Sequence, residues 1–222
     1  MYVRNSVFSL LAISLLGVAS VAHADTVYSL DTSACSSGCL VLPAGTVDLK
    51  QNGKDDVLVT VTLTSDYSFR KAPDDNHHAL AFDLSDVSGT VTAANISNAL
   101  FTFSGAGSYK DAGLGSNFSY AFEDKIGNDG SVQTFSFDLK AAGLTETSFV
   151  SNGSFFFGVD VKGLDVAAGV GKTGNIGADG KLITSGAPPP VPEPSSIALM
   201  GTGLLACAGL MQRKKLDAIK AS

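Results

Sequence analysis

The sequence predicts an all-β fold: a single antiparallel β-sandwich of jelly-roll type, flanked by an N-terminal signal peptide and a C-terminal transmembrane helix. Along many short segments in the middle of the chain, apolar and polar residues alternate, which is the period of a half-buried strand. Gly, Ser, Thr, Asn and Asp separate these segments and favour turns. Between residues 25 and 187 no long stretch combines helical periodicity with caps, so we expect no helix there.

The clearest strand covers residues 56–64, where Val57, Val59 and Val61 share one face and threonines occupy the other. Six further segments show the same alternation and are predicted strands: residues 78–84, 89–92, 99–104, 117–123, 131–139 and 153–161.

The segments between these strands predict turns. Residues 125–130 contain Asn, Asp and Gly, which favour positive φ, so they predict a hairpin that joins the strands on either side. Residues 141–147 are long enough for one helical turn. The Gly-rich residues 170–187 predict either a loose strand or a linker.

Residues 1–24 have the three parts of a secretory signal peptide. Arg4 supplies the positive region, and residues 7–21 form an apolar run that is too short to span a membrane comfortably. Ala22 and Ala24 provide the small residues of a cleavage site. Asp25 is therefore the expected mature N-terminus, and signal peptidase is an expected partner.

The other end of the chain carries a second signal. Residues 188–194 form a proline-rich spacer, because prolines avoid helix interiors and favour an extended chain. Residues 195–212 follow as a predicted transmembrane helix, which at its uncharged length spans roughly 25 Å. Residues 213–222 begin with the basic cluster Arg213, Lys214 and Lys215, which resists translocation and marks a cytoplasmic tail. An ordinary tail anchor behind a linker explains the same pattern.

The spacer contains a motif that, with the apolar helix and the basic cluster, resembles the PEP-CTERM sorting domain of Gram-negative bacteria. The motif consists of Val191, Pro192, Glu193, Pro194 and Ser195. The resemblance covers about residues 190–215. It implies processing by an exosortase, an integral membrane cysteine enzyme of strains that make extracellular polysaccharide.

The same resemblance implies a route for the protein. The precursor would be anchored in the inner membrane with residues 25–187, the passenger, in the periplasm, and would then reach the cell surface or extracellular matrix. Residues 135–139, 153–161 and 171–177 are similar to the ends of other PEP-CTERM passenger domains. Those domains have no assigned function, so the similarity names no ligand.

The passenger is acidic. Residues 25–187 contain 19 Asp and Glu against 10 Lys and Arg, which gives a formal charge of 10 − 19 = −9. Nucleic acid is therefore not an expected partner, because phosphate binding needs a basic stripe. Divalent cations and neutral sugars remain compatible with this charge.

Cys35 and Cys39 are the only cysteines between the two terminal signals, and in an exported chain they predict a disulfide. So small a ring adds only about 2 kcal/mol and would fix a local loop. A redox or metal role is the alternative. Cys207 is expected to serve simply as a small residue within the membrane helix.

His77 and His78 follow an Asp-rich stretch and predict a surface loop, with a weak metal site alongside Asp74 or Asp75 as the alternative. No metal ligand set and no cofactor is expected. Structural calcium at the Asn/Asp/Gly-rich residues 52–56, 128–130 or 178–180 is the alternative, although turn chemistry explains these segments as well.

No sequence motif for a catalytic nucleophile, zinc site or phosphate loop is present, so no catalytic residue is expected. Aspartate pairs such as Asp83 with Asp86, or Asp138 with Asp160, would act as glycosidase carboxylates only if the fold brought them together. Without tryptophan, a sugar platform would depend on tyrosines, namely Tyr67, Tyr109 and Tyr120.

These observations predict a non-enzymatic, exported protein of the cell envelope. Its expected role is structural or adhesive, in association with exopolysaccharide in a biofilm. A carbohydrate-binding module is the alternative within binding functions. A polysaccharide hydrolase or lyase is the enzymatic alternative.

Overall fold

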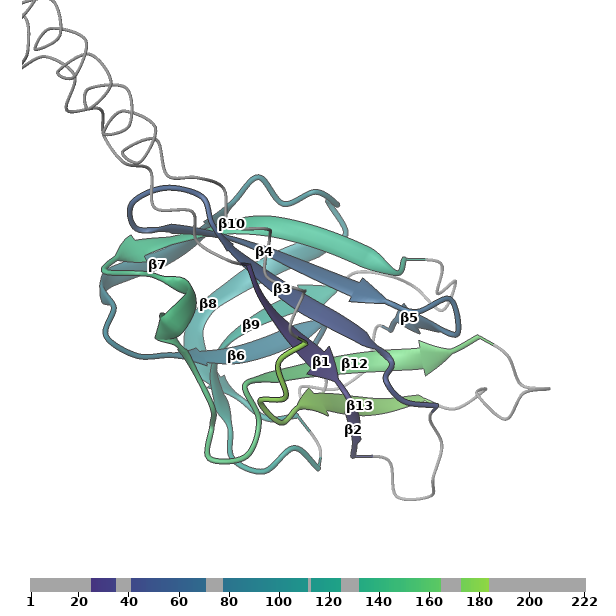
Figure 1. The fold of residues 1–222 in the computed structure, drawn as a ribbon. Coiled ribbons are helices and arrows are strands. Elements are labelled where there is room, and N and C mark those ends of the chain that lie inside the picture. Colours follow the sequence, from purple (N-terminus) through teal and green to yellow (C-terminus); the bar gives the residue numbers. More distant parts are fainter. Residues whose placement is uncertain are drawn as a thin grey trace, which may run out of the picture. The chain divides into compact units, whose positions relative to one another are not determined.

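The computed structural model describes residues 25–34, 41–70, 78–111, 113–124, 132–164 and 173–183 of the chain. Within these residues the chain forms two antiparallel sheets and no α-helix (Figure 1). All described strands belong to one compact unit, His23–Gly186. The predicted all-β class and the antiparallel pairing are therefore confirmed.

The first sheet has five strands in the order β1-β3-β4-β10-β7. Its pairing follows from alternation in the central strand, where Val59 lies opposite Leu49 of one neighbour and Phe137 of the other, all three fully buried. Apolar residues of adjacent strands thus share one face. The strands are β1 (Thr26–Leu30), β3 (Gly45–Gln51), β4 (Asp56–Leu63), β10 (Thr134–Ala142) and β7 (Ser88–Ala94).

The second sheet contains eight strands, six of them in the order β2-β13-β12-β6-β9-β8. Strand β5 (Tyr67–Phe69) pairs with β12, and β11 (Phe149–Val150) pairs with β6. A 3-10 turn, η1 (Glu146–Ser148), precedes β11. The six ordered strands are β2 (Thr32–Ser33), β13 (Thr173–Ala178), β12 (Phe157–Gly163), β6 (Leu80–Leu84), β9 (Phe118–Asp124) and β8 (Phe101–Tyr109).

One hydrophobic cluster draws on both sheets. Phe101 of β8 stacks on Phe135 of β10 with ring centroids 4.0 Å apart, and Phe122 of β9 lies 4.1 Å from Phe137 of β10. Residues of the eight-stranded sheet therefore contact residues of the five-stranded sheet directly, so the two sheets share a core.

A smaller cluster lies on the other face of the eight-stranded sheet. Ala81 falls between Leu80 and Phe82, which belong to the main core, so strand alternation turns Ala81 to the opposite face. There it packs with Leu114, Phe118 and Ala121. The eight-stranded sheet is therefore covered by apolar side chains on part of both faces.

All seven predicted strands are present with shifted ends. Residues 56–64, 78–84, 89–92, 99–104, 117–123, 131–139 and 153–161 correspond to β4, β6, β7, β8, β9, β10 and β12. The helical turn expected in residues 141–147 occurs later, as η1. The Gly-rich residues 170–187 contain a genuine strand, β13, whose Ile176 and Ala178 are fully buried.

The predicted hairpin between residues 117–123 and 131–139 is wrong. Strand β9 pairs with β6 and β8, whereas β10 pairs with β4 and β7, so the two strands belong to different sheets. The apolar faces explain this outcome, because Phe137 of β10 lies opposite Val59 of β4, whereas Phe122 of β9 lies opposite Leu80 of β6. The connecting residues 125–131 lie outside the described residues.

Within the described residues, no helix is long and apolar enough to cross a membrane. The predicted signal peptide and the predicted C-terminal helix both lie outside these residues, as do Cys35 and Cys39.

Tyr67 is a buried polar anchor at one end of the second sheet. Its ring belongs to the main core, and its hydroxyl accepts a hydrogen bond from Val41 N at 2.6 Å and donates one to Val41 O at 2.9 Å. Burial raises the pKa of the Tyr67 phenol above 10.0, an effect that the Val41 hydrogen bond partly offsets. The neutral phenol is thus the form that stabilises the fold.

This raised pKa predicts a loss of stability in alkali. Because the folded-state pKa exceeds that of the unfolded chain, the contribution of Tyr67 is complete below about pH 10 and is lost as the pH rises through the folded-state pKa. Tyr67→Phe should lower the free energy of unfolding by about 1–3 kcal/mol at pH 8, since two hydrogen bonds disappear. The same variant should weaken the decline above pH 10 in urea titrations. An unchanged decline, or an equal flattening by the control Tyr120→Phe, would contradict this role.

Candidate functional site

The loop between β8 and β9 covers the small apolar cluster of the second sheet. Leu114 in this loop is fully buried. A Cβ atom built on Gly158 of β12 would lie 2.5 Å from Asp111 Oδ2 and 2.9 Å from Leu114 Cδ1. Only glycine therefore lets the loop approach the strand so closely. Gly113 and Gly115 allow the loop to turn, with φ of 85° and 81°.

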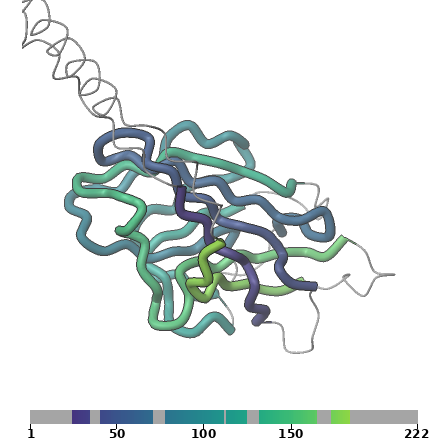
Figure 2. Tube along the Cα trace, in the orientation of Figure 1, coloured from purple at the N-terminus to yellow at the C-terminus, as the bar shows by residue number. Residues whose placement is uncertain are grey.

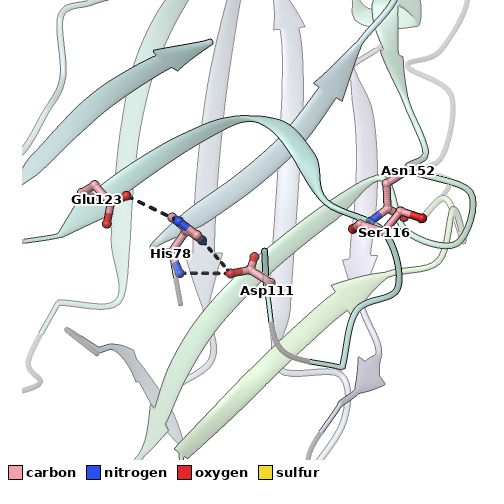
Figure 3. A network of polar contacts seen from close by, with 5 residues as sticks. All are labelled: His78, Asp111, Ser116, Glu123 and Asn152. Carbon is pink, nitrogen blue, oxygen red and sulfur yellow. Dashed lines mark hydrogen bonds and ion pairs between the residues drawn. The ribbon is translucent and has the colours of Figure 1, made fainter. Parts of the chain in front are cut away.

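His78, two residues before β6, holds this loop through Asp111 (Figure 3). Asp111 Oδ1 lies 2.9 Å from His78 Nδ1 and also accepts a hydrogen bond from His78 N at 3.1 Å. On the other side of the ring, Nε2 lies 3.5 Å from Glu123 Oε1 of β9, and Tyr109 contacts the ring edge-on. One histidine thus connects β6, β9 and the loop.

Asn152 holds the same loop from the segment between β11 and β12 (Figure 3). Its amide nitrogen donates to Leu114 O at 3.1 Å and to Ser116 O at 2.6 Å. Its amide oxygen accepts from Ser154 N and Phe155 N at 3.1 and 3.0 Å. We call His78, Asp111, Glu123 and Asn152, together with Ser116, the loop clamp.

The loop clamp contains an aspartate–histidine pair, which in some enzymes serves as a general base. A base of that kind must reach a proton of the substrate. The His78 side chain is only 3% exposed and the Asp111 side chain is fully buried. In this structure the pair is closed to a substrate, and its geometry connects segments of the fold.

Two other carboxylates hold segments together in the same way. Glu146 of η1 accepts hydrogen bonds from Thr26 Oγ1 at 2.9 Å and from Gln51 N at 2.6 Å, which connects β1 and β3 to the turn. Asp138 of β10 accepts from Asn52 at 3.3 Å and from Asn95 at 2.5 Å. The sequence alone does not identify Glu146 or Asp138 as connecting residues, because their partners are between 43 and 120 positions away.

The prediction that His77 and His78 lie in a surface loop is wrong for His78. Its side chain is buried because the ring packs between Asp111, Glu123 and Tyr109. His77, Asp74 and Asp75 lie outside the described residues. Among the part of the chain that the structure describes, no group of three His, Cys, Asp or Glu side chains is placed to hold a metal ion.

Asp138 and Asp160 do not come together as the pair that a glycosidase would need. Phe137 and Leu139 place one strand's inner face in the main core, and Val159 and Val161 do the same for the other strand. Alternation therefore turns the two aspartates to the outer faces of different sheets. Asp83 instead accepts a hydrogen bond from Ser119 N at 2.6 Å, and Asp86 from Ser85 Oγ at 3.1 Å.

The tyrosines proposed for sugar stacking differ in exposure. Tyr67 is fully buried, whereas Tyr109 and Tyr120 are half-buried. Tyr120 has Phe82 stacked at 5.6 Å and Phe103 stacked at 6.4 Å, and Tyr109 packs against His78.

Two of the three segments considered for calcium, residues 52–56 and 178–180, are described and show turn contacts. Asp55, with φ of 62°, accepts a hydrogen bond from Gly143 N at 2.8 Å, and Asp56 pairs with Lys140 at 3.1 Å. Asp179 accepts one from Lys181 N at 3.2 Å. Residues 128–130 lie outside the described residues.

Of the predicted processing residues, only Asp25 is described, as an exposed residue just before β1, 3.6 Å from Lys50 Nζ. Outside the described residues lie Ala22, Ala24, Val191, Pro192, Glu193, Pro194, Ser195, Arg213, Lys214 and Lys215.

Comparison with protein families concerns the C-terminal part of the chain. Residues 190–214 match the family of the PEP-CTERM protein-sorting motif. The chain therefore carries a PEP-CTERM sorting motif, which indicates an exported protein with a C-terminal signal for exosortase-type sorting. Neither curated proteins nor solved structures gave a match to this chain.

The loop clamp predicts a specific effect of removing Asp111. Asp111→Ala should lower the free energy of unfolding by about 2–4 kcal/mol, because buried donors of His78 lose their acceptor. Hydrogen exchange should speed up most at amides 113–117. The control Glu123→Gln changes a carboxylate that is 47% exposed, so it should cost less than about 1 kcal/mol. Equal losses in the two variants, or unchanged exchange at 113–117, would show that Asp111 does not hold the loop.

Proposed function

We propose that this protein is a structural or adhesive component of the cell surface or exopolysaccharide matrix. Signal peptidase removes residues 1–24, residues 195–212 hold the precursor in the inner membrane, and an exosortase cuts near Pro192 to Ser195. The single observation that carries this proposal is the sorting motif at residues 190–214. The order of spacer, apolar stretch and basic cluster supports the membrane step.

For the passenger, we propose a β-sandwich built from the two sheets. The stack of Phe101 on Phe135 supports this architecture, since it joins strands of different sheets at 4.0 Å. The disulfide between Cys35 and Cys39 remains part of the proposal because the protein is exported.

A non-catalytic role is supported by what the described polar residues do. His78 and Asp111 are closed off from solvent and hold a loop. Asp138 and Asp160 face away from each other, so this pair offers no glycosidase geometry. The hydrolase or lyase alternative therefore has no support from the carboxylates discussed above.

Carbohydrate binding is the second candidate function. The acidic body is compatible with neutral sugars, and an association with exopolysaccharide would provide the ligand. Coverage of Tyr67 and Tyr120 counts against a tyrosine platform in the described residues. A binding site would then depend on hydrogen bonding more than on ring stacking.

The sorting proposal predicts the mass of the released protein. Cells that produce an exosortase should release a wild-type chain that ends near Pro192 to Ser195. Changing Pro192 and Glu193 together to alanine should abolish this cut and leave residues 213–215 on the product. Pro188→Ala, which lies outside the matched residues, serves as the control and should be cut normally. Intact-mass spectrometry distinguishes these products, and a cut double variant would contradict recognition of the motif.

The structural role predicts inert behaviour toward the producer's polymer. The released protein should generate no reducing ends from that exopolysaccharide, with or without calcium. Binding on a glycan array that contains fragments of the polymer would favour the carbohydrate-binding alternative. Release of reducing ends by the wild-type protein would overturn the non-enzymatic proposal.

A further inference from the structure

The last described residues, 181–183, lie along the outer edge of β1, and we call them the strap. Ser29 N donates to Lys181 O at 3.1 Å, and Ile183 N donates to Val27 O at 2.8 Å. Leu182 is the bridge partner of Tyr28. Figure 2 shows the yellow-green end of the described chain beside its purple beginning. The first strand and the end of the body therefore share one edge.

Little besides these backbone bonds holds the strap. Leu182 and Ile183 are 53% and 42% exposed, so their side chains bury little apolar surface. Lys181 Nζ lies 3.8 Å from Asp31, but the Lys181 side chain is 73% exposed, and solvent screens such a pair. Among the described residues, the main core extends from Tyr28 to Ala178 and does not include the strap. The strap can therefore open locally while the core remains intact.

The strap lies a short distance in sequence from the sorting motif. Only residues 184–191, which include three consecutive prolines, separate Ile183 from Pro192. Eight residues reach at most about 29 Å when fully extended, and about 25 Å as polyproline. Opening the strap would add three residues, or about 10 Å.

We propose that the strap sets the reach of the sorting motif from the body. While it is closed, the β1 edge is the fixed point from which the spacer extends to the exosortase in the membrane. This inference rests on the proposed sorting function and names the strap as the element that limits access of the exosortase to the motif. A tether that is just too short allows almost no encounter with a membrane-embedded enzyme, so processing should depend steeply on the length available.

The test uses the full-length chain in exosortase-producing cells. Deleting residues 184–186 shortens the spacer by about 10 Å and should reduce the cut product about fivefold or more, since a tether that cannot span its sites loses its effective concentration. Opening the strap in this shortened chain should restore cutting. Lys181→Glu together with Ile183→Pro opens it, because the glutamate repels Asp31 and proline lacks the N–H that binds Val27 O.

Two controls separate length from other effects. Reinserting Gly-Ser-Gly at the deletion should restore cutting, whereas Leu182→Ala in the shortened chain should not, because it keeps both backbone bonds. Because unfolding of the body would also free chain length, the strap variant is compared with the wild type by limited proteolysis, and recovery with a protease-resistant body supports the strap. The inference is overturned if the shortened chain is cut like the wild type, or if the strap variant stays uncut while the reinsertion is cut. A wild-type chain that is never cut would instead contradict the sorting function.

Discussion

The contact between Phe101 and Phe135 is the interaction on which the body depends, because it joins the two sheets. Their rings stack at 4.0 Å with an interplanar angle of 9°, and Phe69 meets both edge-on at 5.2 and 5.1 Å. Aromatic pairs of this kind contribute about 0.5–1.5 kcal/mol beyond the area that they bury. Three strands that are far apart in the sequence thus meet at one point, and the rest of each strand follows by alternation.

Alternation also decides where the charged groups can go. With one face of every central strand in the main core, acidic residues are turned to the outer faces. Asp138 is buried on such an outer face and connects to Asn52 and Asn95. Two buried carboxylates outside the strands also act as connections: Asp111 of the β8–β9 loop to His78, and Glu146 of η1 to Thr26 and Gln51. A buried carboxylate requires such donors. These donors account for the burial of Asp111, Asp138 and Glu146.

The sequence predicted the elements with strong alternation and missed those that depend on distant partners. Strand β4 has three fully buried valines in its own sequence, so its period is unmistakable. Strand β13 has only Ile176 and Ala178 as buried apolar residues, and its Gly177 is required because the Phe155 ring occupies the space of a Cβ. In the sequence alone, Gly177 is typical of a linker, because its contact with Phe155 is not evident there.

The candidate site shows the same division. The sorting motif is contiguous, so the sequence alone located it, and the family match confirms it. The loop clamp depends on contacts across 33 to 45 positions, from His78–Asp111 (33) to His78–Glu123 (123 − 78 = 45), and no local signal connects these residues. The failed hairpin has the same origin, because turn residues show that the chain reverses but not which sheet the next strand joins.

Within the described part of the chain, every residue of the main core lies between Tyr28 and Ala178. In the sequence, this range falls between the two proposed targeting segments, residues 1–24 and 188–222. The exposed edge of β1 would invite pairing with another chain, and the strap covers it with residues that precede the spacer. Cleavage near Pro192 leaves that cover in place. The described core and the closed edge of β1 are thus built from residues 26–183, between the two proposed cleavage points.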